Sequence, residues 1–408
     1  MPKLFQINVC NNCYSSGKIV SAIGELAIAN GWNSYIAYSR DYSPNLNTSI
    51  KIGNKLDVCL NALEQRLFDN TGFGIGSYFS TKQLVKELKK IQPDIIHLHV
   101  IVGYYLNFRV LFNYLSTLDI PIVWTLHSCW EITGHCTHFD YEGCERWITG
   151  CYKCPLKREY PQSFFIDNSR HNYTNKKNYF TKAKKMHLVA VSKWLSGVVS
   201  KSFLGDKPIE VIYNGVDTNL FKPSQDTSYL RKTYNLEEQF VAVALASTWL
   251  PKKGIPDYYK LADILPHNYS LVMIGFPKDE IEKLPHNIIG VPRTTDINEL
   301  RDFYSMADVV LNLSYEESFG LTTVEGFACG TPAIVYDKTA SPELVTEDTG
   351  FVVKAGDIIG VLESMKLIQQ KGKESYTKAC RERAMTVFDK DKNFKMYIEL
   401  YNKLLRIE

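Results

Sequence analysis

Residues 307–336 read ADVVLNLSYEESFGLTTVEGFACGTPAIVY, and this stretch decides the predicted fold. The runs 307–313 and 331–336 are short and apolar, as buried strands are. Between them, residues 321–323 (Leu-Thr-Thr) offer hydroxyl groups that suit the start of a helix. We therefore expect a strand, a tight loop, a helix and a second strand. In a parallel sheet, loops at the carboxyl ends of strands are where ligands bind.

Two carboxylates, Glu317 and Glu325, stand eight residues apart around this loop. The backbone N–H groups of Gly320, Leu321 and Thr322 would lack helical partners and could hold a phosphate. Glu325 could accept hydrogen bonds from a ribose, and Glu317 from a second polyol. This arrangement suits a nucleotide sugar. Ordinary solvated or capping acids would explain the same spacing equally well, because acids favour a first helical turn.

Strand-like and helix-like segments alternate along the whole chain, which predicts an α/β fold with parallel sheets and helices on both faces. With 408 residues and 46.7 kDa, the chain should form about two domains. Crossover helices are expected near 81–90 and 297–306. Strands are expected near 4–9, 34–38, 94–98, 122–126, 187–191, 209–212, 240–245, 270–275, 288–291, 308–313 and 333–336.

The Glu317–Glu325 spacing resembles the E-x7-E motif of retaining glycosyltransferases of family four, which carry two Rossmann-like domains in the GT-B arrangement, facing a deep cleft. Further segments resemble the family in the same order: 8–19, 93–99, 125–127, 191–194 and 212–217. The resemblance implies three parts. They are an acceptor-side domain (1–203, with a cysteine-rich insertion at 129–160), a nucleotide-sugar-binding domain (204–388) and a C-terminal helix (389–408) that crosses back to the first domain.

The resemblance also assigns roles in the first domain. Gly17 would belong to the glycine-bearing first loop of the donor site. His127, at the end of the predicted strand 122–126, would hydrogen-bond the donor sugar. His97 and His99 flank Leu98, so strand alternation places them on one face. His99 is the candidate for the acceptor side, whereas His97 is expected to serve packing.

In the second domain, the resemblance makes Lys253 the cation that neutralises the departing diphosphate. The family usually carries an arginine five residues earlier, where this chain has Thr248, and Ser128 replaces an aspartate common in close relatives. Lys252 or the helix start at 320–322 would then carry more of the charge. The implied catalytic residues are Glu317, His127 and Lys253. The implied donor-binding residues are Gly17, Thr248, Lys253, Gly320, Leu321, Thr322 and Glu325.

The activity that the resemblance implies is that of a hexosyltransferase. A sugar would move, with retention of configuration, from a nucleotide-diphosphate sugar to a glycan or lipid-linked acceptor in bacterial surface-polysaccharide synthesis. No cofactor is required for transfer in this scheme, because Lys253 and the 320–322 amides stabilise the leaving group. A nucleotide-sugar epimerase and a non-catalytic sugar-binding protein are the alternatives.

Four of the ten cysteines lie close together in a C-x7-C-x6-C-x2-C pattern. In a reducing compartment, such density favours a structural metal over disulfides. Tetrahedral zinc takes four sulfur ligands. A zinc site at Cys136, Cys144, Cys151 and Cys154 is therefore one hypothesis, and four unligated thiols in a loop are an equal alternative.

The net charge is only +3, but residues 170–207 contain nine Lys or Arg and a single acid, Asp206. Aromatic and aliphatic residues are interleaved with them. Such a segment suits an anionic membrane surface, and a solvated helical face is the equal alternative. Nucleic acid is not expected, because no binding module accompanies the charge. No apolar run approaches the length of a membrane span, and the N-terminus reads as a strand rather than a signal peptide. We therefore expect a cytoplasmic protein, peripheral at the inner face of the membrane if the basic segment binds lipid.

Overall fold

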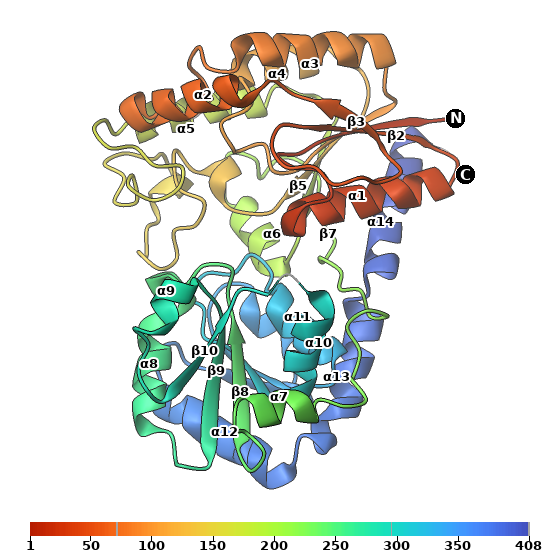
Figure 1. Cartoon of the computed structure of the whole chain (residues 1–408). Helices are drawn as coiled ribbons and strands as arrows, with labels where there is room; N and C mark the ends of the chain where they lie inside the picture. Colours follow the sequence, from red (N-terminus) through yellow and green to blue (C-terminus); the bar gives the residue numbers. More distant parts are fainter. Residues whose placement is uncertain (71, 295, 407–408) are drawn as a thin grey trace. The chain divides into compact units, whose positions relative to one another are not determined.

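The computed structural model describes residues 1–70, 72–294 and 296–406. The chain divides into two compact units. Unit 1 comprises Met1–Tyr213 and Phe394–Glu408, and unit 2 comprises Asn214–Asn393. Each unit is built around a parallel sheet with helices between most successive strands (Figure 1).

The sheet of unit 1 has seven parallel strands in the order β3-β2-β1-β4-β5-β6-β7. Its central strands β4 and β5 are buried along their whole length, so both faces of the sheet are covered. The strands are β1 (Lys3–Ile7), β2 (Asn33–Tyr38), β3 (Thr48–Lys51), β4 (Ile95–Leu98), β5 (Ile122–Leu126), β6 (Met186–Ala190) and β7 (Ile209–Val211). The α-helices are α1 (Tyr14–Ala29), α2 (Lys55–Phe68), α3 (Tyr78–Ile91), α4 (Phe108–Leu115), α5 (Ser169–Phe180) and α6 (Lys193–Val199).

The sheet of unit 2 has six parallel strands in the order β10-β9-β8-β11-β12-β13. Its strands are β8 (Phe240–Leu245), β9 (Tyr269–Phe276), β10 (Ile288–Pro292), β11 (Val309–Asn312), β12 (Ala333–Tyr336) and β13 (Gly350–Val353). Its α-helices are α7 (Ser228–Thr233), α8 (Ile255–Ile264), α9 (Lys278–Ile281), α10 (Ile297–Met306), α11 (Leu321–Ala328), α12 (Ile358–Lys371) and α13 (Glu374–Val387).

The last helix, α14 (Lys390–Leu405), packs on the sheet of unit 1. Phe394, Tyr397 and Tyr401 are buried in one hydrophobic cluster with residues of β1, β4 and α1. Hydrogen bonds add to this packing: the Tyr401 hydroxyl lies 2.6 Å from Nδ1 of His97, and Thr125 Oγ1 lies 3.2 Å from the Tyr397 hydroxyl. The end of the chain thus completes the core of the unit in which the chain begins.

The α/β prediction with parallel sheets is confirmed. Two strands, β3 and β13, were not predicted, and both lie at a sheet edge. The sequence of β3 is TSIK, which lacks the apolar run of a buried strand. The predicted domain boundary at 203/204 also differs from the structure. Strand β7 pairs with β6, so unit 1 continues to Tyr213.

Candidate active site

The sheet of unit 2 changes direction between two adjacent strands, β8 and β11. From β8 the chain proceeds outward through β9 and β10, and then returns to continue through β11, β12 and β13 on the other side. The loops after β8 and β11 therefore leave the same edge of the sheet, at the switch point where open α/β sheets bind ligands. The short 3-10 turn Pro251–Lys253 follows β8, and Glu317 follows β11.

The two loops are tied together by an ion pair and by the backbone. Lys253 Nζ lies 2.6 Å from Oε1 of Glu317 and also donates to the carbonyl of Glu316 at 3.3 Å. Gly254, at φ +79°, permits the contact, because a Cβ there would stand 2.2 Å from the Leu313 carbonyl oxygen. The Lys253 and Glu317 side chains keep 31% and 19% exposure, so a ligand can reach both.

Helix α11 begins at the same edge. Gly320 precedes it in the left-handed region, at φ +107°. The Asn312 amide at the end of β11 donates to Thr323 Oγ1 at 3.2 Å, which fixes the helix start against the strand. The first N–H groups of a helix lack helical acceptors, so those at Leu321 and Thr322 are suited to an anion.

Glu325 lies one turn into α11 and is half-buried. Its Oε2 accepts a hydrogen bond of 2.7 Å from the hydroxyl of Tyr304, a fully buried residue of α10. Tyr304 was not among the site residues predicted from the sequence. Its only signal was its place in the crossover helix expected near 297–306, because a buried phenol hydroxyl requires a polar partner.

Lys252, one candidate to compensate for Thr248, lies against a buried acid. Its Nζ is 3.5 Å from Oε2 of Glu316, and the two side chains keep 17% and 3% exposure. Thr248 itself is exposed. Lys253 is therefore the cation that the structure places beside Glu317.

In unit 1, Gly17 lies in the first turns of α1 and is buried. Its carbonyl accepts a hydrogen bond from the N–H of Asn12 at 3.1 Å. A Cβ at this position would meet Cys10 Sγ at 2.9 Å, so a glycine allows the loop after β1 to fold back on the helix.

The three histidines meet at the ends of β4 and β5. His97 and His99 do share one face, and their ring centroids are 3.8 Å apart. His99 Nδ1 lies 3.4 Å from Nε2 of His127. Burial lowers the pKa of His127 to about 4, and it lowers the pKa values of His97 and His99 well below their usual range. All three rings are therefore neutral near pH 7.

The four cysteines of the insertion line one small cavity, together with Thr133 and Phe139. The zinc hypothesis is nevertheless not supported. Within residues 1–70, 72–294 and 296–406, no group of three or more His, Cys, Asp or Glu side chains is placed to hold a metal ion. Instead, the thiols of Cys136 and Cys154 hydrogen-bond each other, and Cys151 Sγ accepts the N–H of Gly134 at 3.1 Å.

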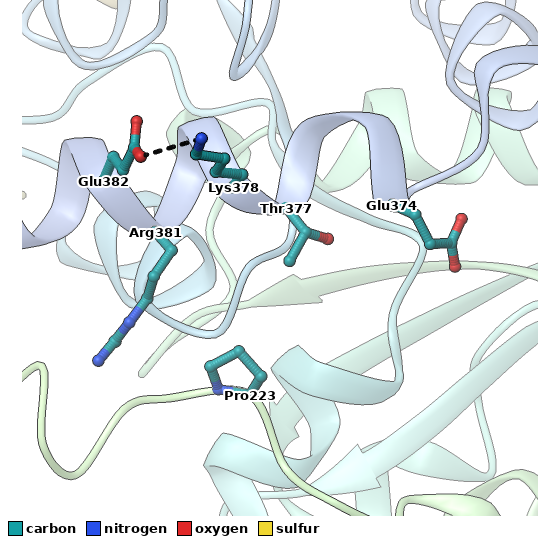
Figure 2. Close-up of a pocket in the computed structure, with 6 residues that line it drawn as sticks. All are labelled: Pro223, Glu374, Thr377, Lys378, Arg381 and Glu382. Atoms are coloured by element: carbon teal, nitrogen blue, oxygen red, sulfur yellow. Dashed lines mark ion pairs between the residues drawn. The ribbon is translucent and has the colours of Figure 1, made fainter.

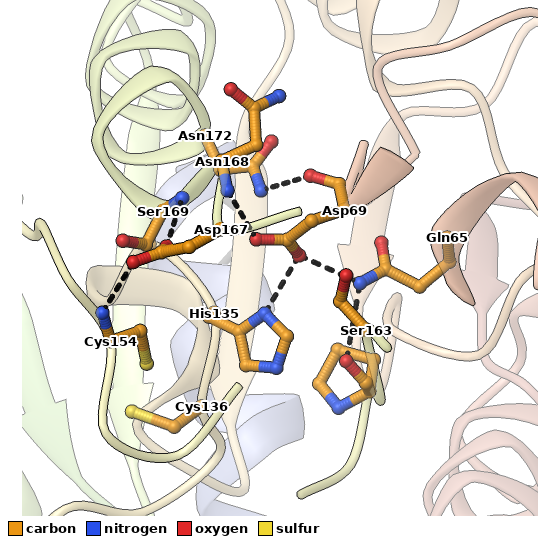
Figure 3. A network of polar contacts seen from close by, with 12 residues as sticks. Gln65, Asp69, His135, Cys136, Cys154, Ser163, Asp167, Asn168, Ser169 and Asn172 are labelled. Carbon is orange, nitrogen blue, oxygen red and sulfur yellow. Dashed lines mark hydrogen bonds and ion pairs between the residues drawn. The ribbon is translucent and has the colours of Figure 1, made fainter. Parts of the chain in front are cut away.

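Polar contacts hold this insertion to the rest of unit 1 (Figure 3). The buried carboxylate of Asp69, at the end of α2, lies 2.7 Å from Nδ1 of His135 and accepts the N–H of Asn168 at 2.9 Å. The hydrogen bond from Cys136 lowers the pKa of Cys154 to about 7, because it favours the thiolate.

The basic segment 170–207 is only partly the surface that was expected. Lys176 is fully buried, with its ammonium group against the Trp130 ring and its pKa lowered to about 7 by burial. Phe180, Leu195 and Val199 are also buried. Some of the apolar residues thus serve the core of unit 1, whereas Tyr179, Trp194, Val198 and Phe203 keep partial exposure beside the exposed lysines.

A separate cavity in unit 2 contains none of the predicted site residues (Figure 2). It is lined by Pro223, Glu374, Thr377, Lys378, Arg381 and Glu382. Arg381 is engaged by backbone carbonyls of Thr218, Phe221 and Ala328 at 2.6–2.7 Å. Its charge serves to hold α13 in place.

Two family models match the chain. "Glycosyltransferase Family 4" matches residues 60–220, and "Glycosyl transferases group 1" matches residues 226–386. The second match contains the Lys253, Glu317 and Glu325 site, and the first contains His99, His127 and the four cysteines.

Relatives with similar sequences include an Escherichia coli protein described as a glycosyl transferase of colanic acid biosynthesis. It is 23% identical over 325 residues, which cover 78% of this chain and 77% of the relative. The O-antigen chain mannosyltransferase of Salmonella typhimurium is 25% identical and covers 57% of this chain and 67% of its own length.

Solved structures share the fold. Sucrose-phosphate synthase from Thermosynechococcus elongatus superposes with a TM-score of 0.72 over the full length of both chains, at 18% identity. An Anabaena protein in complex with UDP gives a TM-score of 0.67 at 15% identity and covers 99% of this chain and 100% of that one. The fold thus agrees with the two family matches, which together span residues 60–220 and 226–386 and show that the chain is a glycosyltransferase of family four.

Proposed function

We propose that this glycosyltransferase moves a sugar from a nucleotide-diphosphate sugar to a glycan or lipid-linked acceptor in the synthesis of a bacterial surface polysaccharide. The observation that carries the proposal is the Lys253–Glu317 pair at the switch point of unit 2, beside the start of α11. Relatives named for colanic acid and O-antigen synthesis support the polymer class.

In this proposal, the leaving diphosphate is bound by Lys253 and the N–H groups of Leu321 and Thr322. A charge-assisted bond from a lysine is about twice as strong as a neutral one. Glu325, held by Tyr304, binds the ribose hydroxyls, and Glu317 orients the donor sugar. In unit 1, the proposal gives Gly17 and His127 contacts to the donor, and it assigns His99 to the acceptor side, where it supports His127.

The chemistry of the step follows from these roles. The bond between the anomeric carbon and the phosphate oxygen breaks, and a bond to the acceptor oxygen forms on the same face of the sugar. The acceptor's proton passes to the leaving phosphate. Charge stabilisation by fixed groups supplies the catalysis, and the configuration of the anomeric carbon is retained.

A donor screen tests the proposal. Purified protein is incubated with a panel of nucleotide sugars, and thermal stabilisation identifies the donor, because a ligand that binds only the folded state raises the melting temperature. Release of the nucleoside diphosphate is then measured with lipid-linked acceptors, and the anomeric configuration of the product is read by NMR. Conversion of the donor without any acceptor would indicate an epimerase. Binding without release of nucleotide would indicate a sugar-binding protein.

The proposal extends to location. Within the described residues, no helix combines the length and the apolar character that a bilayer crossing requires. We place the enzyme in the cytoplasm, at the inner face of the membrane, through the exposed lysines of 170–207, such as Lys177, Lys184 and Lys185. Retention on anionic vesicles at low salt, lost at high salt, is the expected behaviour. If the vesicles do not retain the protein at low salt, the proposed location at the membrane is wrong.

A further inference from the structure

A chain of hydrogen bonds runs across the ends of three neighbouring strands in unit 1, from Gln6 on β1 through His99 after β4 to His127 after β5. Gln6 and His99 have no exposed surface, and His127 is half-buried. His99 Nε2 lies 3.1 Å from Gln6 Oε1, and His99 Nδ1 lies 3.4 Å from His127 Nε2. Each of these bonds constrains where the ring protons reside.

The orientation of the Gln6 amide determines which atom donates and which accepts in each of these hydrogen bonds. Its Nε2 donates to the backbone carbonyl of Val20 at 3.0 Å. A carbonyl can only accept, so the nitrogen of the amide must face Val20 and the oxygen must face His99. Gln6 Oε1 is an acceptor, and therefore the proton of His99 is on Nε2.

The tautomer of His127 follows from that of His99. A neutral imidazole with its proton on Nε2 offers a lone pair at Nδ1. His127 Nε2 faces this lone pair, so it must carry the proton. Nδ1 of His127 is then an unprotonated acceptor. Within the described part of the chain, no side chain or backbone group hydrogen-bonds to this atom.

Ring geometry agrees with these assignments. The ring planes of His99 and His127 differ by 27°, and their centroids are 5.7 Å apart. The His97 ring lies against that of His99, tilted by 38°, with centroids 3.8 Å apart. His97 is itself held by the Tyr401 hydroxyl at 2.6 Å and by Thr125 Oγ1 at 2.8 Å. The plane of His99 is thus fixed by its neighbours.

We propose that Gln6 and His99 are positioning residues that hold His127 as its Nε2–H tautomer, so that Nδ1 of His127 accepts a hydrogen bond from a sugar hydroxyl. The inference rests on the proposed function for the identity of the ligand. In this inference, His127 recognises a substrate hydroxyl by accepting its hydrogen bond, and it does not donate a proton. A substrate in which that hydroxyl is replaced by hydrogen loses one neutral hydrogen bond, which corresponds to about two- to tenfold in affinity.

The hydroxyl can belong to the donor sugar or to the acceptor, and the experiment separates the two. Monodeoxy analogues of the accepted nucleotide sugar are compared by their affinity in the absence of any acceptor. Monodeoxy acceptors are compared by their KM. In the wild type, one analogue in one of the two series is expected to bind about two- to tenfold more weakly than its parent compound. In His127→Leu, the same analogue and its parent should bind equally well.

The tautomer is measured directly in the full-length, ligand-free protein with 15N-labelled histidine. Long-range proton–nitrogen spectra near pH 7 are expected to show a protonated Nε2 and an unprotonated Nδ1 on His127. Gln6→Leu removes the acceptor that orients His99, and His127 should then populate both tautomers. His99→Asn can still offer an oxygen near the former Nδ1 position and should preserve the wild-type tautomer.

Thr81→Val is the matched control, because it removes another buried hydrogen bond of unit 1, from the N–H of Asn107 to Thr81 Oγ1. It should cost stability without changing the His127 spectrum or the discrimination between hydroxyl and deoxy substrates. A protonated Nδ1 in the wild type, or an unchanged spectrum in Gln6→Leu, would overturn the tautomer assignment. Equal binding of every deoxy analogue would overturn the role of the hydroxyl. Failure of the proposed function itself would appear separately, as no nucleotide sugar binding with the tautomer intact.

Discussion

Lys253 Nζ and Glu317 Oε1 lie 2.6 Å apart, so their opposite charges neutralise each other in the ligand-free protein. The proposed role of Lys253 is to bind the diphosphate, and that of Glu317 is to orient the donor sugar. An incoming diphosphate must draw Lys253 from this pair. We predict that Lys253→Ala and Glu317→Ala each reduce transfer about a hundredfold or more, because each removes a preorganised group at the reacting centre.

The two losses should differ in their effect on nucleotide binding. Lys253→Ala weakens the binding of the nucleoside diphosphate, whereas Glu317→Ala frees the lysine and leaves that binding equal or tighter. Calorimetry with the diphosphate product measures this. Lys354→Ala and Glu347→Ala, at exposed positions of the same unit, are the controls. Near-normal turnover in both site variants would refute the assignment.

A second prediction concerns Tyr304, whose hydroxyl holds Glu325 at 2.7 Å. Tyr304→Phe keeps the buried ring and removes the hydrogen bond that orients the carboxylate. We expect the donor KM to rise about ten- to a hundredfold with little change in kcat, since one hydrogen bond to a charged group is lost. Tyr376→Phe is the matched control, because the buried Tyr376 hydroxyl finds no hydrogen-bond partner among the described residues. An unchanged donor KM in Tyr304→Phe would contradict the role.

The thiol pair gives a prediction about pH. The Cys136 hydrogen bond lowers the pKa of Cys154 to about 7, whereas the pKa of Cys136 is raised well above its usual range. Only the thiolate is alkylated, so the rate at Cys154 should rise with pH, reach half its maximum near pH 7 and level off above it. Iodoacetamide labelling followed by peptide mass spectrometry measures the rate, with exposed Cys59 as the reference.

Cys136→Ala removes the hydrogen bond that favours the thiolate. The midpoint for Cys154 should therefore move to higher pH in this variant. The same midpoint in the variant and the wild type would show that another group sets the acidity of Cys154.

A fourth prediction concerns the anchoring of α14. Tyr401→Phe leaves Nδ1 of buried His97 without its 2.6 Å partner. An unsatisfied buried acceptor costs about 1–3 kcal/mol, so the free energy of unfolding of unit 1 should fall by that amount. Hydrogen exchange at β4 and β5 in urea measures it. Tyr35→Phe, whose ring stacks on Phe5 in the same sheet, should change little. Unaltered exchange in Tyr401→Phe would exclude the anchoring role.

The sequence was sufficient for the fold where strands are buried on both faces. Strands such as β5, all of whose residues are buried, leave a continuous apolar run in the sequence. It was insufficient at the sheet edges, because β3 is exposed and polar. It was also insufficient for α-helical lysines. Lys176 reads as a surface charge, yet the Trp130 ring and carbonyl hold its ammonium group inside unit 1.

In the candidate site too, some features could be predicted from the sequence and others could not. The spacing, together with the family resemblance, predicted the carboxylates and the loop before α11, since these lie close together in the sequence. The partners that hold them come from distant elements. Tyr304 reaches Glu325 from the preceding helix, and Gln6 reaches His99 from a strand 93 residues earlier. Only the packed sheet brings such residues together, so no local pattern could reveal them.

The return of α14 to unit 1 has a consequence for biosynthesis. Unit 2 is interposed within the chain of unit 1, between Tyr213 and Phe394. During translation, all of unit 2 is synthesised between the strands of unit 1 and Tyr397 and Tyr401, the residues that complete the unit 1 cluster. The sheet that begins with the first residues must wait, with part of its apolar cluster uncovered, until the last helix has been synthesised.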